Sequence, residues 1–453
     1  MIKNYNSIRL YWIYTIIAVI SFILCIIGTY SFIHNKPLYL LPLSYAVGLL
    51  VSRRLSKKFT SLSVLIINSV CIIRYALLPL LLISENHFQE YSNEAIYLMS
   101  YEVIAVMIFL NICSKRIRTE RIKNKVYNMF CLGKLNQLLI FMLVPMIMMY
   151  PSLLGIFPYL RSSFGHASPS GVISVAFEIS LTVAYVFFLV SYSRSSKGDP
   201  IALGFSGIVA LIYMFLTMMG DTNVRRWTFF WVGIPTIYVL MASYSKYKKS
   251  ILFVSAIIIP IGIFFTSFVK FSLNDVSVSE FFKNFITSDI ISEYFGGLNG
   301  ITRSLDILRV NPEANTLTST MTDLFGNMPI VSRFFNPNQY STQLIYLDVL
   351  DRRDLICPLL SQSVIHFGII GAPILSIIMT FCAVECEVAS KEAITVYSYY
   401  AYIELCVIIA LFMCLSTMII LTHAWTLIIL VIVQYLNDKY CFHGKVIHNR
   451  SGV

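Results

Sequence analysis

Arginine side chains are the residues of this chain that point most directly to chemistry. Between about Leu273 and Pro358, a polar segment interrupts a sequence that is otherwise strongly apolar. A planar guanidinium group donates paired hydrogen bonds to phosphate oxygens, and its charge does not depend on pH. Arginines gathered in one polar segment therefore predict a site for a large anionic substrate; they are Arg303, Arg309, Arg333, Arg352 and Arg353.

A second group of polar residues lies in the short segment GDTNVRRW (220–227). It contains Asp221, Arg225 and Arg226, and another arginine, Arg161, lies in a different short loop. Arg226 stands beside Trp227, where an arginine commonly reaches toward lipid headgroups. Arg225 and Asp221 are better placed for chemistry, as a cation and as a carboxylate.

His366 is the histidine whose position is most suggestive. It falls about two helical turns into the apolar segment 359–382, and Gln362 precedes it by one turn on the same face. A single histidine on an apolar helix is more often a packed, hydrogen-bonded residue than a catalyst. Because the arginine-rich segment leads directly into this helix, we nevertheless expect His366 to be a candidate general base.

Sequence signatures of metal and nucleotide sites are absent from the chain. There is no HExxH, DxD, Walker or G-x-S-x-G pattern. Cys382 and Cys386 are four residues apart, but no histidine or second cysteine pair completes a zinc site. We expect no metal and no cofactor.

Composition defines the elements that must hold these residues. The 453 residues are 57% hydrophobic and only 13% charged, whereas soluble domains carry about 25% charged residues. Apolar runs long enough to cross a bilayer recur along the chain, so we predict an all-α polytopic membrane protein with about 12 transmembrane helices. The predicted spans are 10–33, 38–52, 59–83, 95–113, 134–157, 172–192, 201–219, 227–243, 251–273, 359–382, 396–414 and 416–436.

Basic residues predict the orientation of these spans. One set of loops is rich in lysine and arginine, including the run SKRIRTERIKNK (114–125), while the opposite short loops hold only Lys36, Arg161, Arg225 and Arg226. The positive-inside rule then places both termini in the cytoplasm. The same rule explains the net charge of +11 without nucleic acid as a partner.

The predicted organisation has four parts along the chain. Residues 1–273 form transmembrane helices 1–9, 274–358 form one large extracytoplasmic loop, 359–436 form helices 10–12, and 437–453 form a cytoplasmic tail. Within the loop we expect a helix over 278–295, with Ser277 and Glu280 as a capping box, ended by Gly296, Gly297 and Gly300. A second helix over 302–310 would place Arg303 and Asp306 on one side. The alternative for this second helix is a solvated helix with local ion pairs.

Three charged residues fall inside predicted spans: Arg74, Glu102 and Glu178. Charges at this depth usually face a bundle interior or a wet cavity. We expect Arg74 and Glu102 to form a pair between neighbouring spans, which would either fix helix packing or line a substrate cavity.

The chain resembles the Wzy-type polymerases of bacterial surface polysaccharides. The resemblance covers most of the chain as architecture, because these proteins have about a dozen spans and a large outside loop before the last three. Locally, GDTNVRR resembles the family's Gly-plus-Arg turn. FGNMPIVSRFFNPNQYSTQLIYLDVL resembles the end of the large loop, and SQSVIHFGIIGAPIL resembles the start of the following span.

This resemblance implies a metal-independent glycosyltransferase of the cytoplasmic (inner) membrane. It would polymerise oligosaccharide repeat units carried on undecaprenyl diphosphate into O-antigen or capsule polysaccharide. Its partners would be the lipid-linked donor and acceptor, membrane lipids, a chain-length regulator and a flippase. Arg225, Arg303 and Arg309, followed by Arg161 and Arg352, would bind the diphosphate, with His366 and then Asp221 as the catalytic base.

Two alternatives share parts of this pattern. An O-antigen ligase has the same architecture and differs in its acceptor, which is lipid A core. A polysaccharide flippase or transporter would line a pathway through the bilayer with charges such as Arg74, Glu102 and Glu178. The large outside loop and the absence of two similar halves speak against transport.

Overall fold

The structure, a computed structural model, is helical throughout the part of the chain that it describes, which contains no strand. The prediction of an all-α polytopic membrane protein is confirmed. The described residues are 2–31, 37–85, 91–117, 130, 132–157, 160, 163, 171–193, 199–218, 227, 229–272, 287–310, 317–328, 331–335, 341–350 and 356–448.

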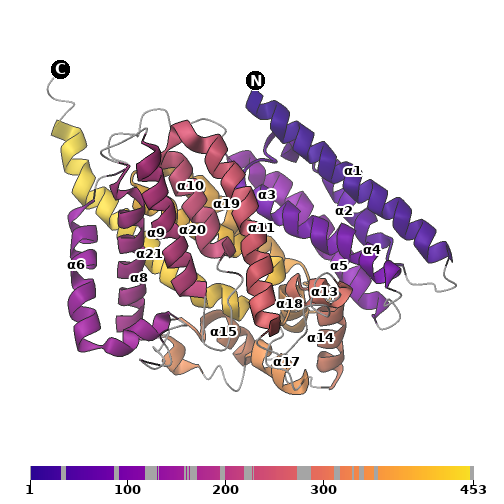
Figure 1. Cartoon of the computed structure of the whole chain (residues 1–453). Helices are drawn as coiled ribbons and strands as arrows, with labels where there is room; N and C mark the ends of the chain where they lie inside the picture. The colour runs from indigo at the N-terminus through magenta and orange to yellow at the C-terminus, as the bar shows by residue number, and fades with distance from the viewer. Residues whose placement is uncertain are drawn as a thin grey trace. The chain divides into compact units, whose positions relative to one another are not determined.

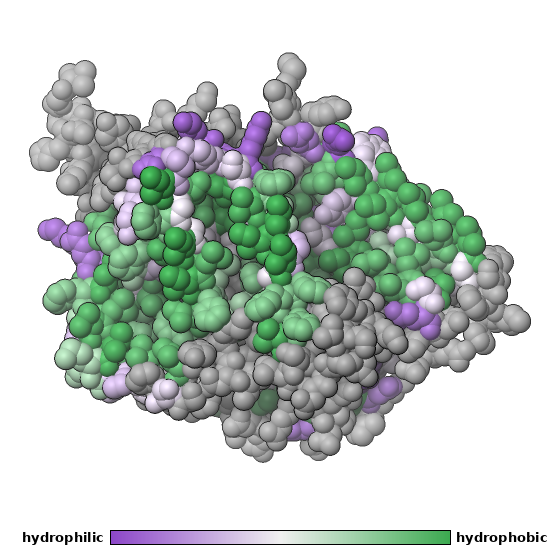
Figure 2. Space-filling view, in the orientation of Figure 1, coloured by the Kyte–Doolittle hydropathy of each residue, from purple (hydrophilic) through white to green (hydrophobic). Residues whose placement is uncertain are grey.

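Seven helical stretches in the described ranges are long and apolar enough to cross a membrane. Four shorter apolar helices accompany them: Leu40–Val51, Lys134–Met149, Phe229–Ser243 and Val396–Ala410. Long helices expose apolar side chains to their surroundings, as expected where lipid replaces water; Ile27 of α1 (Ile2–Ser31) is 58% exposed and Phe253 of α11 (Lys248–Ser272) is 68% exposed. Figure 2 shows hydrophobic residues covering these two helices.

Helix bounds follow the predicted spans closely where the sequence is uniformly apolar. Figure 1 shows the helices coloured by their position along the chain. The chain clusters into two compact units, and each draws on separate parts of the sequence. Unit 1 comprises Met1–Glu120, Phe282–Val388 and Ile408–His423, and unit 2 comprises Arg121–Phe281, Ala389–Val407 and Ala424–Val453. The predicted loop 274–358 therefore contributes most of its length to the same unit as the first spans.

Unit 1 begins with helices that pack around α2 (Leu40–Val51), which contacts both α1 and α5 (Asn93–Cys113). Ser92 caps α5 by accepting a hydrogen bond from the Ala95 backbone N–H at 3.1 Å. Between α2 and α5, the next span consists of α3 (Leu62–Cys71), the π-helical turn η2 (Ile72–Leu77) and α4 (Leu78–Ser84). Pro79 lacks the N–H that an α-helix would bond one turn back, and the wider π turn lies at this point.

The π turn carries Arg74, and the predicted pair with Glu102 is confirmed. Arg74 Nη1 lies 3.1 Å from Glu102 Oε2, and both side chains are 1% exposed or less. Glu102 also accepts hydrogen bonds from Tyr75 at 2.9 Å and from Ser376 at 2.6 Å. Complete burial of the pair favours a role in fixing helix packing over a role in lining a substrate cavity.

The predicted span 359–382 is not one continuous helix. α18 (Leu359–Phe367) ends at Gly368, whose φ of 71° lies in the left-handed region, and α19 (Ile374–Glu392) starts after a turn that contains Pro373. Glycine adopts this φ without steric penalty, and proline favours the first turn of a new helix. His366 therefore lies in the last turn of α18, beside a break, instead of in the interior of a long span.

Short helices follow residue 287 in unit 1: α13 (Ser288–Tyr294), α14 (Leu298–Val310), α15 (Leu317–Phe325) and α17 (Thr342–Leu350). The helix expected over 302–310 is present as part of α14, which contains Gly300, so that glycine does not break a helix as predicted. The start expected at Ser277 lies outside the described residues. Gly296, with φ of 59°, ends α13, as predicted.

Gly296 is the glycine at which substitution should be most harmful. A Cβ there would collide with the Met413 carbonyl oxygen, and the backbone is left-handed. Gly296→Ala should therefore lower the free energy of unfolding by at least about 1–2 kcal/mol, measured by thermal unfolding in detergent. Gly204→Ala on α9 (Pro200–Met218), where nothing lies within 4 Å of the new Cβ, is the matched control and should not destabilise. Equal stability of the two variants would contradict this expectation.

Unit 2 contains α6 (Lys134–Met149), α8 (Val172–Ser191), α9, α10 (Ile234–Ser243), α11, α20 (Val396–Ala410) and most of α21 (Thr417–His448). Asn136 and Gln434 exchange two buried amide hydrogen bonds of 3.1 and 2.8 Å, which join α6 to α21. Tyr185 and Tyr213 stack with ring centroids 3.9 Å apart, joining α8 to α9. These polar and aromatic contacts add specificity to packing between apolar helices.

Candidate functional site

An acid and a histidine from two different helices meet inside unit 1. His366 Nε2 on α18 lies 3.0 Å from Asp323 Oδ2 on α15, and their side chains are 3% and 1% exposed. The second ring nitrogen, Nδ1, lies 2.8 Å from Thr320 Oγ1, one helical turn before Asp323. Hydroxyl, imidazole and carboxylate thus lie in series.

Hydrogen bonds to Asp323 define the proton arrangement of this series. Its carboxylate accepts from Ser341 Oγ at 3.1 Å, from Thr342 N at 3.0 Å, from Thr342 Oγ1, and from Gln362 Nε2 at 3.3 Å. An ionised carboxylate only accepts hydrogen bonds, so His366 Nε2 donates to it. Nδ1 is then the basic nitrogen, and the Thr320 hydroxyl donates to it.

Gln362 connects this network to two further helices by hydrogen bonds. Its Nε2 also donates to Thr342 Oγ1 at 2.7 Å, and its Oε1 accepts from both the backbone N–H and the hydroxyl of Thr417 at 2.7 Å. The network therefore joins α15, α17, α18 and the start of α21. A base whose partners are fixed by four helices is preorganised for proton transfer.

The position of His366 also favours the charged ring that proton transfer would produce. The histidine lies in the last turn of α18, where the negative end of the helix dipole stabilises a cation. The buried Asp323 carboxylate adds a second stabilising charge at 3.0 Å. The pair can accept a proton from a hydroxyl group placed where the Thr320 hydroxyl now lies.

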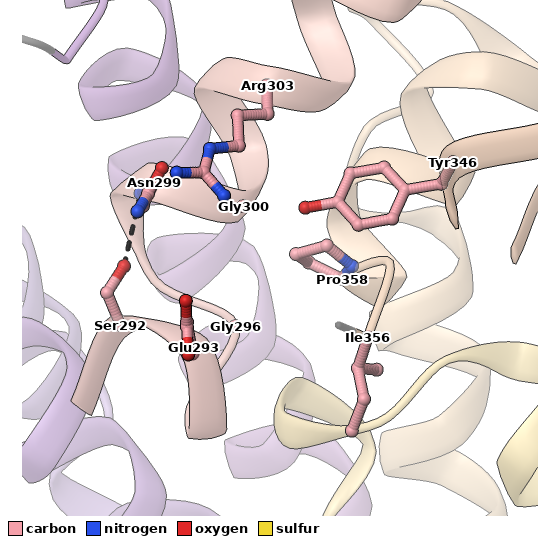
Figure 3. A pocket seen from close by; sticks show the side chains of 9 residues that line it. All are labelled: Ser292, Glu293, Gly296, Asn299, Gly300, Arg303, Tyr346, Ile356 and Pro358. Carbon is pink, nitrogen blue, oxygen red and sulfur yellow. Dashed lines mark hydrogen bonds between the residues drawn. The ribbon is translucent and has the colours of Figure 1, made fainter. Parts of the chain in front are cut away.

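Arg303 lines a hollow in the same unit. Figure 3 shows its guanidinium group beside Asn299 and Gly300, with the Tyr346 hydroxyl pointing across the hollow from the other side. Arg303 is half-buried, and no ion pair from the described residues reaches it. The remaining lining residues are Ser292, Glu293, Gly296, Ile356 and Pro358.

Glycine keeps this hollow open. A Cβ at Gly300 would lie 2.8 Å from Pro358 Cγ and 3.7 Å from the Tyr346 hydroxyl, so any larger residue would push into the space. Ser292 of α13 accepts a hydrogen bond from the Asn299 N–H of α14 at 3.1 Å, which stabilises the turn between these two helices. Arg303 shares the hollow with the Glu293 carboxylate, and its guanidinium group, which has no ion pair among the described residues, can donate hydrogen bonds to an anion.

The hollow and the Asp323–His366 pair are neighbours. α17 carries Thr342 of the network and Tyr346 of the hollow, and α18 begins after Pro358 of the hollow and carries Gln362 of the network. Each pair of residues is four apart, which is about 6 Å along a helix. Thr342 and Gln362 of the network thus each lie about one helical turn from a residue that lines the hollow, whereas His366 is eight residues, about 12 Å along a helix, from Pro358.

Exposed apolar side chains flank the same site. Phe367, Ile369 and Ile370, which follow His366 directly, are 42%, 68% and 88% exposed. Leu317 and Met321, on the helix that carries Thr320 and Asp323, are exposed as well. The site is therefore bordered by a surface suited to lipid.

Two of the predicted site residues, His366 and Arg303, lie in unit 1 on α18 and α14, two helices that contact each other. Arg309 lies in α14, but its side chain is outside the described residues, as are Asp221, Arg225, Arg161 and Arg352. Sequence reasoning missed Asp323 and Thr320. The only available signal was the three-residue spacing of a hydroxyl and a carboxylate within a short polar helix.

Comparisons with known proteins give no match: no family model, no curated protein and no solved structure is similar to this chain. The chemistry of the site therefore rests on its own geometry.

Proposed function

We propose that this protein is a glycosyltransferase that polymerises oligosaccharide repeat units linked to undecaprenyl diphosphate into surface polysaccharide, O-antigen or capsule. The reaction would take place at the outer face of the cytoplasmic membrane, with both termini of the chain in the cytoplasm. The observation that supports this most directly is a buried Asp323–His366 pair in the same unit as a hollow lined by Arg303.

The chemistry of this transfer needs a base and an anion site. The acceptor sugar's hydroxyl attacks the anomeric carbon of the donor, its proton passes to His366 Nδ1, and the bond to the diphosphate breaks. Asp323 does not touch substrate; it holds the imidazole in the tautomer whose Nδ1 accepts, and the acceptor hydroxyl takes the place of the Thr320 hydroxyl on Nδ1. Arg303 stabilises the charge that develops on the departing diphosphate, an interaction that grows toward the transition state.

The surroundings suit a lipid-linked substrate. The exposed apolar residues that follow His366 would contact the polyprenyl chain, while the glycan extends into water. Arg225, Arg309, Arg161 and Arg352 remain proposed diphosphate ligands, and Asp221 remains a second candidate base.

Arg303→Ala tests the anion site. Purified full-length protein in liposomes, given undecaprenyl-diphosphate-linked repeat units, should polymerise them about 10²–10³-fold more slowly after this change, because one preorganised cation is lost. Chain length would be followed by gel electrophoresis of the glycan. Arg303→Lys should recover only part of the rate, since an ammonium group cannot donate two parallel hydrogen bonds.

Arg116→Ala is the matched control. Arg116 is 59% exposed and pairs with Glu385 at 2.6 Å, away from the hollow, so its loss should leave polymerisation unchanged. Normal chain lengths from Arg303→Ala would remove the diphosphate role of this arginine. Failure of the unmodified protein to lengthen any glycan would remove the polymerase proposal itself.

A further inference from the structure

One intramembrane carboxylate in each unit differs from the other in its hydrogen-bond and ion-pair partners. In unit 1, Glu102 faces Arg74 at 3.1 Å and accepts two further hydrogen bonds. In unit 2, Glu404 lies near the middle of α20, and its Oε2 atom is buried without a hydrogen-bond partner in the described part of the chain. Among the described residues, no cation pairs with this second acid as Arg74 pairs with Glu102.

Tyrosine side chains form the surroundings of Glu404. Tyr185, Tyr213 and Tyr400 all lie within electrostatic range of its carboxylate. The Tyr185 ring stacks on Tyr213 at 3.9 Å and meets Tyr400 edge-on at 5.9 Å. The Tyr185 hydroxyl is 2.7 Å from Thr236 Oγ1, which in turn donates to the Val232 carbonyl oxygen at 2.6 Å, so Tyr185 donates to Thr236.

Neutralising charge is missing from the helices that surround this acid. The sequences of α8, α9, α10 and α20 contain no lysine, arginine or histidine. The other charged group that acts on Glu404 is Glu178 of α8, a second carboxylate. Glu404 therefore has a second carboxylate, Glu178, and three tyrosines near it, and no lysine or arginine of the described residues pairs with it.

An ionised carboxylate in such surroundings is strongly unfavourable, and a group in this position takes up a proton or pairs with a cation. No cluster of three metal-ligating side chains occurs among the described residues. We propose that Glu404 forms an intramembrane proton-binding site in unit 2, bordered by Tyr185, Tyr213 and Tyr400. The bound proton takes the place that Arg74 holds beside Glu102.

This site is separate from the Asp323–His366 pair and does not depend on the glycosyltransferase proposal. A proton bound at this depth lies within the membrane's electric field, which acts on charges moved across it. The site gives unit 2 a group through which the proton gradient across the membrane can act.

Labelling with dicyclohexylcarbodiimide tests the proposal in the full-length protein reconstituted in liposomes. The reagent reacts with protonated carboxyl groups in apolar surroundings: its nitrogen takes the proton, the carboxylate oxygen adds to its central carbon, and rearrangement gives a stable N-acylurea that retains every atom. Peptide mass spectrometry should find the adduct on Glu404. Labelling should fall about tenfold per pH unit above the titration midpoint of the group.

Glu102 is the internal control, because it is equally apolar in its surroundings but paired with Arg74, and it should stay unlabelled. Glu404→Gln, which mimics the neutral acid, should fold normally and lose the adduct at this position. An unlabelled Glu404, equal labelling of Glu102 and Glu404, or protection of Glu404 by Na⁺ would each overturn the proton site.

Discussion

Replacing His366 with alanine should reduce polymerisation of lipid-linked repeat units by about 10²–10⁴-fold, the usual contribution of a general base. In the described network, the imidazole Nδ1 is the atom that can accept the proton, because the Asp323 carboxylate already accepts four other hydrogen bonds. The loss should fall on kcat, with little change in KM, since the substrate hydroxyl still binds. Rates would be measured with the purified protein and synthetic lipid-linked units.

Asp323→Asn should reduce the rate of polymerisation by a similar factor, for a different physical reason. The asparagine amide can donate to His366 Nε2, which would then become the acceptor and leave the proton on Nδ1. The base would face the acceptor hydroxyl in the wrong tautomer, although the fold stays intact. Because Asp323 is a positioning residue, the pH–rate profile should change in shape together with the rate, whereas a purely structural role would leave the profile in place.

Glu385→Gln is the matched acid-to-amide control for Asp323→Asn. Its side chain is 36% exposed and pairs with Arg116 at the surface, so polymerisation should be unaffected. Normal rates from His366→Ala, with thermal unfolding also normal, would exclude this histidine as the base. Normal rates from Asp323→Asn alone would confine the acid to a structural role.

Glu102→Gln should lower the free energy of unfolding by about 3–5 kcal/mol, the range seen when one partner of a buried ion pair is removed. Arg74 would remain fully buried in unit 1 without a counter-charge. None of its nitrogens has a well-directed hydrogen bond in the described structure, so the 3.1 Å contact with Glu102 is the main compensation. Thermal or denaturant unfolding in detergent would measure the change.

The double variant Arg74→Met, Glu102→Gln separates charge from packing. Methionine fills much of the space without charge, and glutamine still accepts from Tyr75 and Ser376, so most of the lost stability should return. The exposed Arg116–Glu385 pair gives the comparison: Glu385→Gln should change stability by at most about 1 kcal/mol. A double variant as unstable as Glu102→Gln would show that the ion pair does not act by charge compensation.

Much of the architecture was predictable because hydropathy is a local property. Any run of apolar residues long enough for a bilayer must be helical to satisfy its own backbone, and spans such as 95–113 and 172–192 appear within a few residues of their expected bounds. The Arg74–Glu102 pair was also predictable, since two opposite charges at similar depth in consecutive long spans have few other partners. Gln362 and His366 share a helix face by spacing alone.

The hydropathy pattern did not predict helix boundaries that depend on only a few residues. The apolar run 359–382 reads as one span, but Gly368 and Pro373 divide it, and this break places His366 at a helix end. A positive φ at one glycine hardly changes the mean hydropathy of the segment.

The sequence by itself determined the membrane class, the helices and the candidate status of Arg303 and His366. Tertiary structure alone decided that Asp323, 43 residues before His366 in the chain, orients its ring, and that α14, which carries Arg303, packs against α18, which carries His366. It also decided that Glu102 has a cation beside it, while no cation of the described residues pairs with Glu404. The reason is physical: helix periodicity records which face of a segment is buried, but it carries no information about which distant side chain is buried against it.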